Sequence, residues 1–125
     1  MDFRALSQYE VWFFYEDNNP SNKVFGFAVY DGVSTKCIYY NNVSKSNYYN
    51  FVYQYDGTKV SLYINGSLVE ELQCGTPNIP SSSFNNIFGT DRAFSSARYF
   101  NGALDNIRIY DRTLTSNEIN VLHNE

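Results

Sequence analysis

The chain has 125 residues, enough for one domain and too few for two. Aromatic residues make up 18% of it, with 12 Tyr and 10 Phe, and such side chains favour pleated, half-buried strands. The formal net charge is −4 and the 9 Lys and Arg residues are scattered, which argues against nucleic-acid binding. The sequence shows no apolar run that could span a bilayer and no signal peptide within residues 1–10.

The first half of the chain predicts three strands. Residues 9–17 and 24–32 are rich in aromatic and β-branched side chains, and the polar segment 18–22 separates them as a loop. Asp31-Gly32 is a turn signal, after which residues 35–42 can return as a partner strand.

The clearest pattern lies between residues 49 and 69. Side chains alternate with period two over 49–55 and again over 59–64, and the two runs are followed by Asp56-Gly57 and Asn65-Gly66. This is the strongest short-range hairpin signal, because Gly, and to a lesser extent Asn, tolerates the positive φ that such turns need. The sequence therefore predicts a three-stranded antiparallel meander whose third strand opens at Ser67.

The region after the meander predicts loops around one short strand. Pro77 and Pro80 argue against a central strand in residues 75–84, whereas residues 85–90 fit a short strand and residues 90–100 an exposed loop. Residues 102–112 are predicted to form the last strand by alternation. Cys37 and Cys74 match no metal or redox motif, so they are either paired or two buried thiols.

The tail predicts a short capped helix. Thr115 fits an N-cap and Glu118, three residues later, completes a capping box. Leu114 and Ile119 can form a hydrophobic staple, and Leu122 can face the sheet together with Ile119. Together with the many short strands, these features argue for an antiparallel β-sandwich or jelly roll.

Two stretches resemble the laminin G-like, concanavalin A-like jelly-roll domains. Residues 49–69 carry that family's Tyr-Asp-Gly turn and Leu-Tyr-Ile-Asn-Gly hairpin, and residues 100–119 its closing glycine, acidic strand, Arg-Ile-Tyr and capped helix. The resemblance covers residues 48–125 well and 8–47 loosely. It implies that residues 1–125 form a single all-β antiparallel sandwich with a short C-terminal helical turn.

The resemblance also leads to two expectations, one about the first strands of the domain and one about a calcium ion. Members of the family carry further strands before residue 10, so the first strands are expected to be missing or short, which leaves an edge that invites a larger assembly or homo-oligomer. In many members the acid at Asp105 helps to bind a structural calcium, and Asp31 and Asp2 are conceivable partners. The alternative is that Asp105 accepts backbone N–H groups from a neighbouring loop.

Carbohydrate is the family's commonest ligand, and sugars need an aromatic platform together with planar polar groups. The candidates lie in a tyrosine- and asparagine-rich region and in the loop before the last strand: Tyr39, Tyr40, Asn42, Tyr48, Asp91, Arg92, Arg98 and Tyr99. The alternative is that the tyrosines are shared between core and surface, as in most β-sandwiches.

Enzyme chemistry has little support. The lone histidine, His123, lies in the tail, and the adjacent Glu70 and Glu71 point to opposite faces of a strand. The expected function is therefore a non-catalytic recognition or adhesion module, without membrane insertion, on an extracellular, cell-surface or virion-surface protein. The alternative is a structural coat, fibre or decoration subunit that acts through protein contacts.

Overall fold

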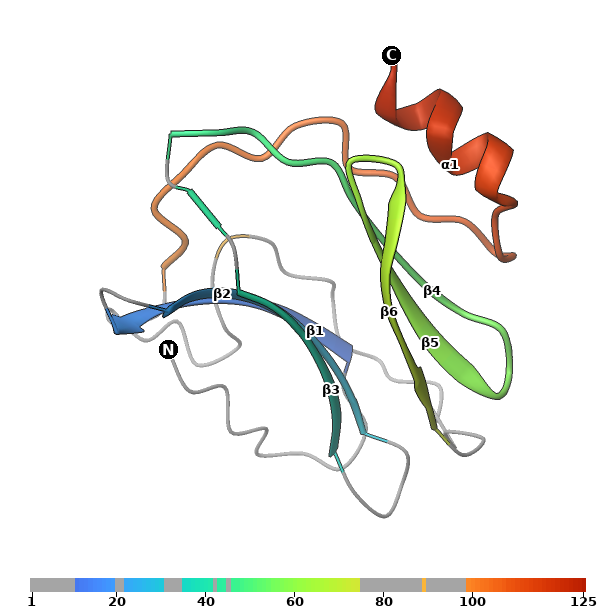
Figure 1. The fold of residues 1–125 in the computed structure, drawn as a ribbon, viewed down its shortest axis with the longest axis horizontal. Coiled ribbons are helices and arrows are strands. Elements are labelled where there is room, and N and C mark those ends of the chain that lie inside the picture. Colours follow the sequence, from blue (N-terminus) through green and yellow to red (C-terminus); the bar gives the residue numbers. More distant parts are fainter. Residues whose placement is uncertain are drawn as a thin grey trace.

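A computed structural model of the chain describes residues 11–19, 22–30, 35–41, 43–44, 46–74, 89 and 99–125. Within these residues the chain is mainly antiparallel β structure with one short helix (Figure 1). The elements in chain order are β1 (Val11–Asn19), β2 (Asn22–Tyr30), β3 (Thr35–Tyr40), β4 (Phe51–Tyr55), β5 (Lys59–Ile64), β6 (Ser67–Gln73) and α1 (Ser116–His123).

Strands β1, β2 and β3 form one antiparallel sheet in that order. Phe27 of β2 lies opposite Phe13 of β1 on one side and opposite Ile38 of β3 on the other. The three strands predicted in the first half are thereby confirmed, with boundaries that differ from the prediction by about two residues, as is usual at strand ends.

Strands β4, β5 and β6 form the second antiparallel sheet, which confirms the predicted meander. The turn after β4 has Gly57 at φ +100°, and the turn after β5 has Asn65 at φ +50° and Gly66 at φ +78°. These positive values explain why Gly and Asn stand there. Strand β6 extends to Gln73, further than the sequence predicted.

Strand β6 contains a β-bulge. Leu62 of β5 lies opposite Glu70, whereas the next residue, Tyr63, lies opposite Leu68, so Val69 is the additional residue on β6. A bulge twists a strand and makes it a poorer template for pairing with another chain.

Among the described side chains, a hydrophobic cluster joins the two sheets. Ile38 of β3 is fully buried against Val60, Leu62 and Ile64 of β5, and the thiol of Cys74 completes the buried set. Each fully buried aliphatic side chain of this kind contributes roughly 1.5–3 kcal/mol. This cluster holds the sheets at the angle seen in Figure 1.

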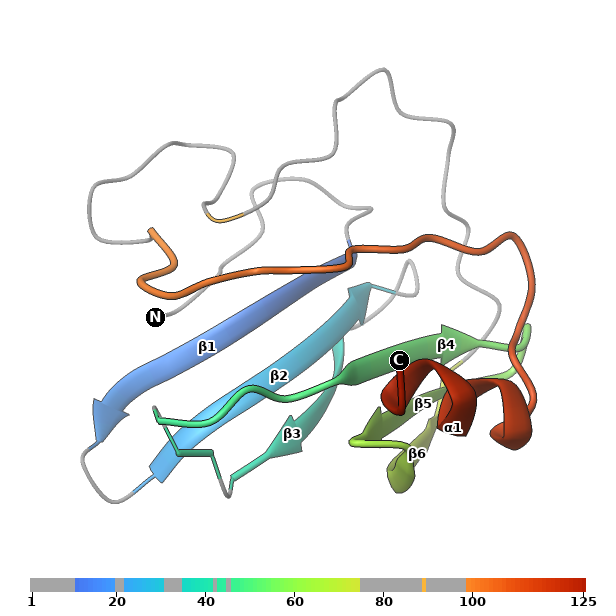
Figure 2. The ribbon, with the colours of Figure 1, turned by 90° about the horizontal axis from the view of Figure 1, so that it is seen from above.

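The opposite face of β5 is covered by α1. Tyr63 of that face, Leu114 and Ile119 form a second buried cluster, against which Val52 and Leu122 pack. The predicted staple and the inward orientation of Ile119 and Leu122 are thereby confirmed. Figures 1 and 2 show α1 lying on the β4–β5–β6 sheet on the side away from β1–β3.

The predicted last strand is wrong. Residues 101–110 join no sheet and run as an exposed, extended segment that leads to α1 (Figure 2, orange). Asn106 at φ +51° interrupts the extended backbone, so the alternation in the sequence does not continue through it. In the predicted strand at residues 85–90, Gly89, the only described position, is not in a strand.

Candidate recognition surface

The end of β3 presents one tyrosine outward and one inward. Because side chains alternate along a strand, the buried Ile38 is followed by Tyr39, which is 47% exposed, and then by Tyr40, which packs against the core. Of this predicted pair, Tyr39 is the more exposed ring, and Tyr40 packs against the core.

The segment before β4 repeats this arrangement. Tyr49 packs against the core, and its hydroxyl oxygen accepts a hydrogen bond from the Ser44 backbone N–H at 2.9 Å. A turn in which the Asn47 N–H donates to the Ser44 carbonyl fixes the same loop. Tyr48 therefore projects outward and is 80% exposed, the most exposed of the large hydrophobic side chains in the described part.

A row of aromatic rings joins the two segments. The Tyr40 and Tyr49 rings meet edge to face with centroids 6.4 Å apart, and Tyr49, Phe51 and Tyr53 follow at 5.8 and 6.2 Å. Burial raises the pKa of Tyr53 well above its usual value, so this phenol stays neutral. The row is a packing element, and the Tyr40–Tyr49 ring contact links the strand that carries Tyr39 to the segment that carries Tyr48.

The other predicted ligand-binding residues divide into two groups. Tyr99 is 54% exposed, and the chain next to it is fixed by a hydrogen bond from the Phe100 N–H to the Gly89 carbonyl at 2.7 Å. The remaining four predicted residues lie outside the described residues: Asn42, Asp91, Arg92 and Arg98.

Asp105 is exposed, and its Oδ1 accepts the Asn106 backbone N–H at 2.8 Å. Asp31 and Asp2 lie outside the described residues. Within the described residues no group of three or more His, Cys, Asp or Glu side chains is placed to hold a metal ion. The calcium prediction stays a prediction, tested by thermal melting with and without a chelator.

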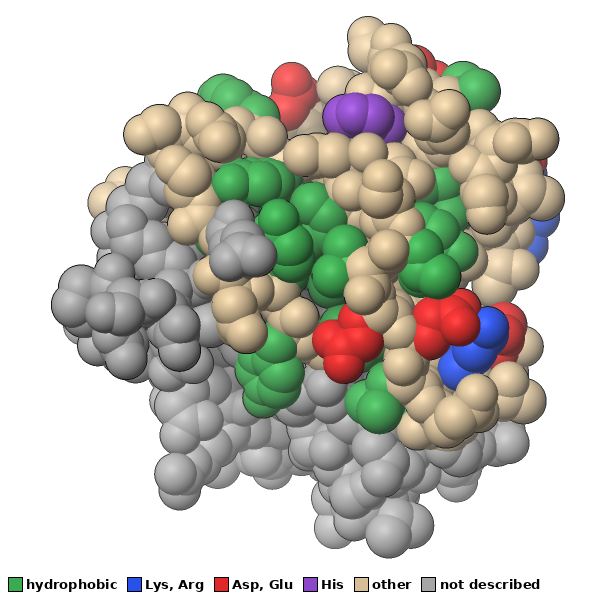
Figure 3. Space-filling model, in the orientation of Figure 1, with side chains coloured by type: hydrophobic (Ala, Val, Ile, Leu, Met, Phe, Trp, Pro, Cys, Tyr) green, Lys and Arg blue, Asp and Glu red, His purple; other side chains and the backbone are tan. Residues whose placement is uncertain are grey.

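Several carboxylates of the described segments are held in structural interactions. Glu71 accepts the Lys59 ammonium at 2.7 Å and the Ser61 hydroxyl at 3.1 Å, and the Lys59 contact is the main cause that lowers its pKa. Asp56 accepts the Lys59 and Thr58 backbone N–H groups, which lower its pKa too. On the face seen in Figure 3, acidic side chains lie beside a basic one, and a group of hydrophobic side chains lies above them.

The contact that holds the tyrosine loop was missed from sequence. The sequence places Tyr49 at the start of the alternating run 49–55, and the Tyr-Tyr pair at 48–49 leading into that strand indicates that one ring points in and the other out. The sequence does not show which of the two rings points inward, because that depends on the position of β3. The same holds for the hydrogen bond from Ser44 to the hydroxyl of the inward ring.

The chain belongs to the concanavalin A-like lectin/glucanase superfamily, because that family's Laminin_G_3 model matches residues 3–120. No curated protein matches the chain in sequence. Among solved structures, an S-layer domain-containing protein from Clostridium thermocellum is similar, with 21% identity and a TM-score of 0.51. The similarity covers 98% of this chain and 67% of that one, and at this identity it shows the fold alone. Among the described residues, no helix has the length and apolar character needed to cross a membrane.

Proposed function

We propose that the chain is a non-catalytic recognition module that binds carbohydrate through Tyr39 and Tyr48. The observation that carries this proposal is the exposure of these two rings, 47% and 80%, on backbones whose neighbouring tyrosines are in contact. Exposed aromatic faces can stack on the C–H face of a sugar, and the exposed amide side chains of Asn41 and Asn47 nearby in the sequence could donate to and accept from its hydroxyls. Membership of a lectin-containing superfamily supports the ligand class.

The pKa shifts of the described carboxyl groups support the proposal that the module is non-catalytic. A glycosidase needs a carboxylic acid whose pKa is raised so that it can protonate the leaving group. Among the described residues, the carboxyl groups whose pKa is clearly shifted have it lowered by donors: Asp56, Glu71 and Glu118. Such groups stay ionised near neutral pH and are poor general acids.

The proposal includes the architecture and the location. We take the two sheets that meet at Ile38 to be the two layers of a complete antiparallel jelly-roll sandwich, of which the described strands are part. We place the module on an extracellular or cell-surface protein, which is supported by the similarity to a structure titled as an S-layer domain-containing protein.

A glycan array followed by titration of the best ligand, monitored by NMR, tests the proposal. We expect Tyr48→Ala and Tyr39→Ala each to weaken binding by about fivefold or more, since an aromatic contact contributes about 1 kcal/mol. Tyr110→Ala, which removes another exposed tyrosine, is the control and should bind as the parent does. An array without signal, or equal affinity in all variants, would refute the proposal.

A second candidate is a structural subunit that assembles through protein contacts. Two observations favour it. The apolar side chains of residues 104–110 are exposed, and the fold is similar to that of the S-layer domain-containing protein. A defined oligomer without glycan binding would favour this candidate, and a monomer that binds glycan would favour the first.

A further inference from the structure

The chain contains two Asn-Gly dipeptides, Asn65-Gly66 and Asn101-Gly102, which the structure places in different surroundings. An asparagine followed by glycine is prone to deamidation, because glycine has no side chain that would hinder ring closure on its backbone nitrogen. The residues that precede the two asparagines, Ile64 and Phe100, are both large and apolar. The unfolded chain should therefore modify both asparagines at similar rates, so a difference in the folded chain reports on structure.

Asn65 is held in the turn between β5 and β6. Its Oδ1 accepts the Asn50 backbone N–H at 2.9 Å, and its own N–H donates to the Asn50 carbonyl at 2.9 Å. On the other side of the turn, a Cβ on Gly66 would lie 3.2 Å from the Asn120 Oδ1 of α1. Ring closure requires the Asn65 side chain to leave Asn50 and to rotate towards the Gly66 nitrogen. The folded turn therefore protects Asn65 until the turn opens.

Asn101 lies in the segment that leads from Phe100 towards α1. Asn101 and Gly102 are both exposed, and residues 101–110 join no sheet. Within the described part of the chain, neither the Asn101 side chain nor the Gly102 N–H makes a hydrogen bond. A Cβ at position 102 would lie 2.7 Å from the Phe100 ring, which explains why glycine stands there. No contact like the one between Asn65 and Asn50 therefore opposes rotation of the Asn101 side chain towards the Gly102 nitrogen.

We propose that Asn101 is a site of spontaneous deamidation in the folded chain, and that the folded turn protects Asn65 from the same reaction. Hydroxide removes the proton of the Gly102 amide, and the nitrogen attacks the Asn101 Cγ. A bond forms between these two atoms, the bond from Cγ to the side-chain nitrogen breaks, and this nitrogen leaves as ammonia with a proton from water. Water then opens the resulting succinimide at either carbonyl and gives aspartate or isoaspartate. The proposal does not depend on carbohydrate binding.

Deamidation of Asn101 changes the surface beside Tyr99. A neutral amide is replaced by a carboxylate, which adds a negative charge to a chain whose formal net charge is −4. The Tyr99 ring, which precedes Asn101 closely in the sequence, is 54% exposed. The isoaspartate product also lengthens the main-chain path at residue 101. An ageing sample should therefore acquire several charge and backbone forms here while the β5–β6 turn stays intact.

Mass spectrometry of the folded chain, incubated at mildly alkaline pH below its melting temperature, tests the proposal. Peptide mapping assigns each gain in mass to a residue, and electron-based fragmentation distinguishes isoaspartate from aspartate. We expect Asn101 to be modified at least about tenfold faster than Asn65, because modification of a protected group follows the population of the opened state. An unmodified Asn101, or an Asn65 that is modified as fast as Asn101, would overturn the proposal.

The same incubation in denaturant separates structure from sequence. We expect the two asparagines to be modified at similar rates there, and a ratio of rates equal to that in the folded chain would overturn the protective role of the turn. Asn101→Gln should lose most of the mass gain of the folded chain, since glutamine must close a larger ring. Its melting curve should match that of the parent, because residue 101 is exposed. Asn65→Asp keeps the oxygen that accepts the Asn50 N–H and is the matched control, in which the mass gain at Asn101 should be unchanged. An undiminished mass gain in Asn101→Gln would overturn the assignment.

Discussion

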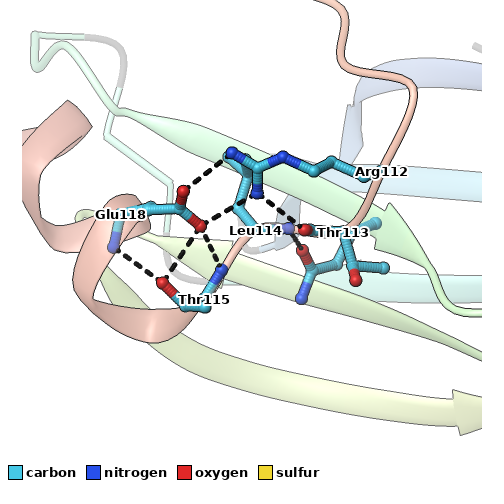
Figure 4. A network of polar contacts seen from close by, with 6 residues as sticks. Arg112, Thr113, Leu114, Thr115 and Glu118 are labelled. Carbon is cyan, nitrogen blue, oxygen red and sulfur yellow. Dashed lines mark hydrogen bonds and ion pairs between the residues drawn. The ribbon is translucent and has the colours of Figure 1, made fainter.

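At the scale of single residues, the carboxylate of Glu118 holds the start of α1 (Figure 4). It accepts the Thr115 N–H at 2.8 Å and hydroxyl at 3.0 Å, and two donors of the Arg112 guanidinium at 3.0 and 2.7 Å. The Thr115 oxygen in turn accepts the Glu118 N–H, which completes the capping box. Mainly because of Arg112, the pKa of Glu118 falls to about 2.

This pKa predicts an acid-sensitive helix start. A carboxyl whose folded pKa is depressed contributes stability above its unfolded pKa, and the contribution is lost as the pH falls from about 4.5 to about 2. We expect Glu118→Gln to lower the melting temperature at neutral pH and to flatten its fall over that window. Identical acid profiles for the parent and Glu118→Gln would contradict the assignment.

The cap itself gives a separate prediction. Thr115→Ala removes the acceptor for the Glu118 N–H and should cost about 1 kcal/mol, or about 4 °C in melting temperature. Thr115→Ser keeps the oxygen and is the control. A Thr115→Ala chain that melts with the parent would show that α1 does not depend on its cap.

At the scale of elements, the turn between β5 and β6 and the helix α1 constrain each other. A methyl group on Gly66 would lie 3.2 Å from the Asn120 Oδ1 and 3.4 Å from His123, and Gly66 has φ +78°. Gly66→Ala therefore meets both backbone strain and a close contact.

A double-mutant cycle separates these two effects. We expect the loss of unfolding free energy caused by Gly66→Ala to be smaller in an Asn120→Ala background, because the 3.2 Å contact is then gone. Gly57→Ala is the control, since Gly57 has φ +100° and no atom within 4 Å of the position where its Cβ would lie. Additive effects of Gly66→Ala and Asn120→Ala, measured by denaturant unfolding, would contradict the contact.

The elements differ in how well sequence predicts them, for physical reasons. The β4–β5–β6 meander and the α1 cap were predictable because turns at Gly57 and Asn65-Gly66 and the Thr115–Glu118 pair are local interactions. Residues 102–112 were not, because alternation indicates which side chains can share a face but not whether a partner strand lies beside them. The left-handed backbone of Asn106 has no sequence signal beyond the tolerance of Asn for it.

The candidate site shows the same limit. The tyrosine-rich region was identified from composition, whereas the separation into inward Tyr40 and Tyr49 and outward Tyr39 and Tyr48 follows from the core against which they pack. The pairing of Arg112 with Glu118 was also missed, because a loop residue six positions before its partner belongs to no capping motif.

At the scale of the whole molecule, β5 is the one strand of its sheet that has a strand on each side among the described residues, and its residues 60–64 are buried. One face of it packs towards Ile38, and the other is shielded by α1, whose approach is fixed by the Leu114 N–H donating to the Gln54 Oε1 at 2.9 Å. We expect the backbone amides of Val60–Ile64 to exchange with deuterium more slowly than those of β4 or β6. Faster exchange in β5 than in β6 would contradict this arrangement.

Because β5 lies at the centre of the molecule, amide exchange in β5 and binding at the surface require motions of different extent. Exchange of a deeply covered amide requires opening of much of the molecule, whereas the side chains of Tyr48 and Ile109 already meet solvent in the native state. Association at the periphery therefore needs no rearrangement of the centre. A ligand or second chain that arrives there should bind rapidly, in one kinetic phase, and leave the slowest-exchanging amides unchanged in their order.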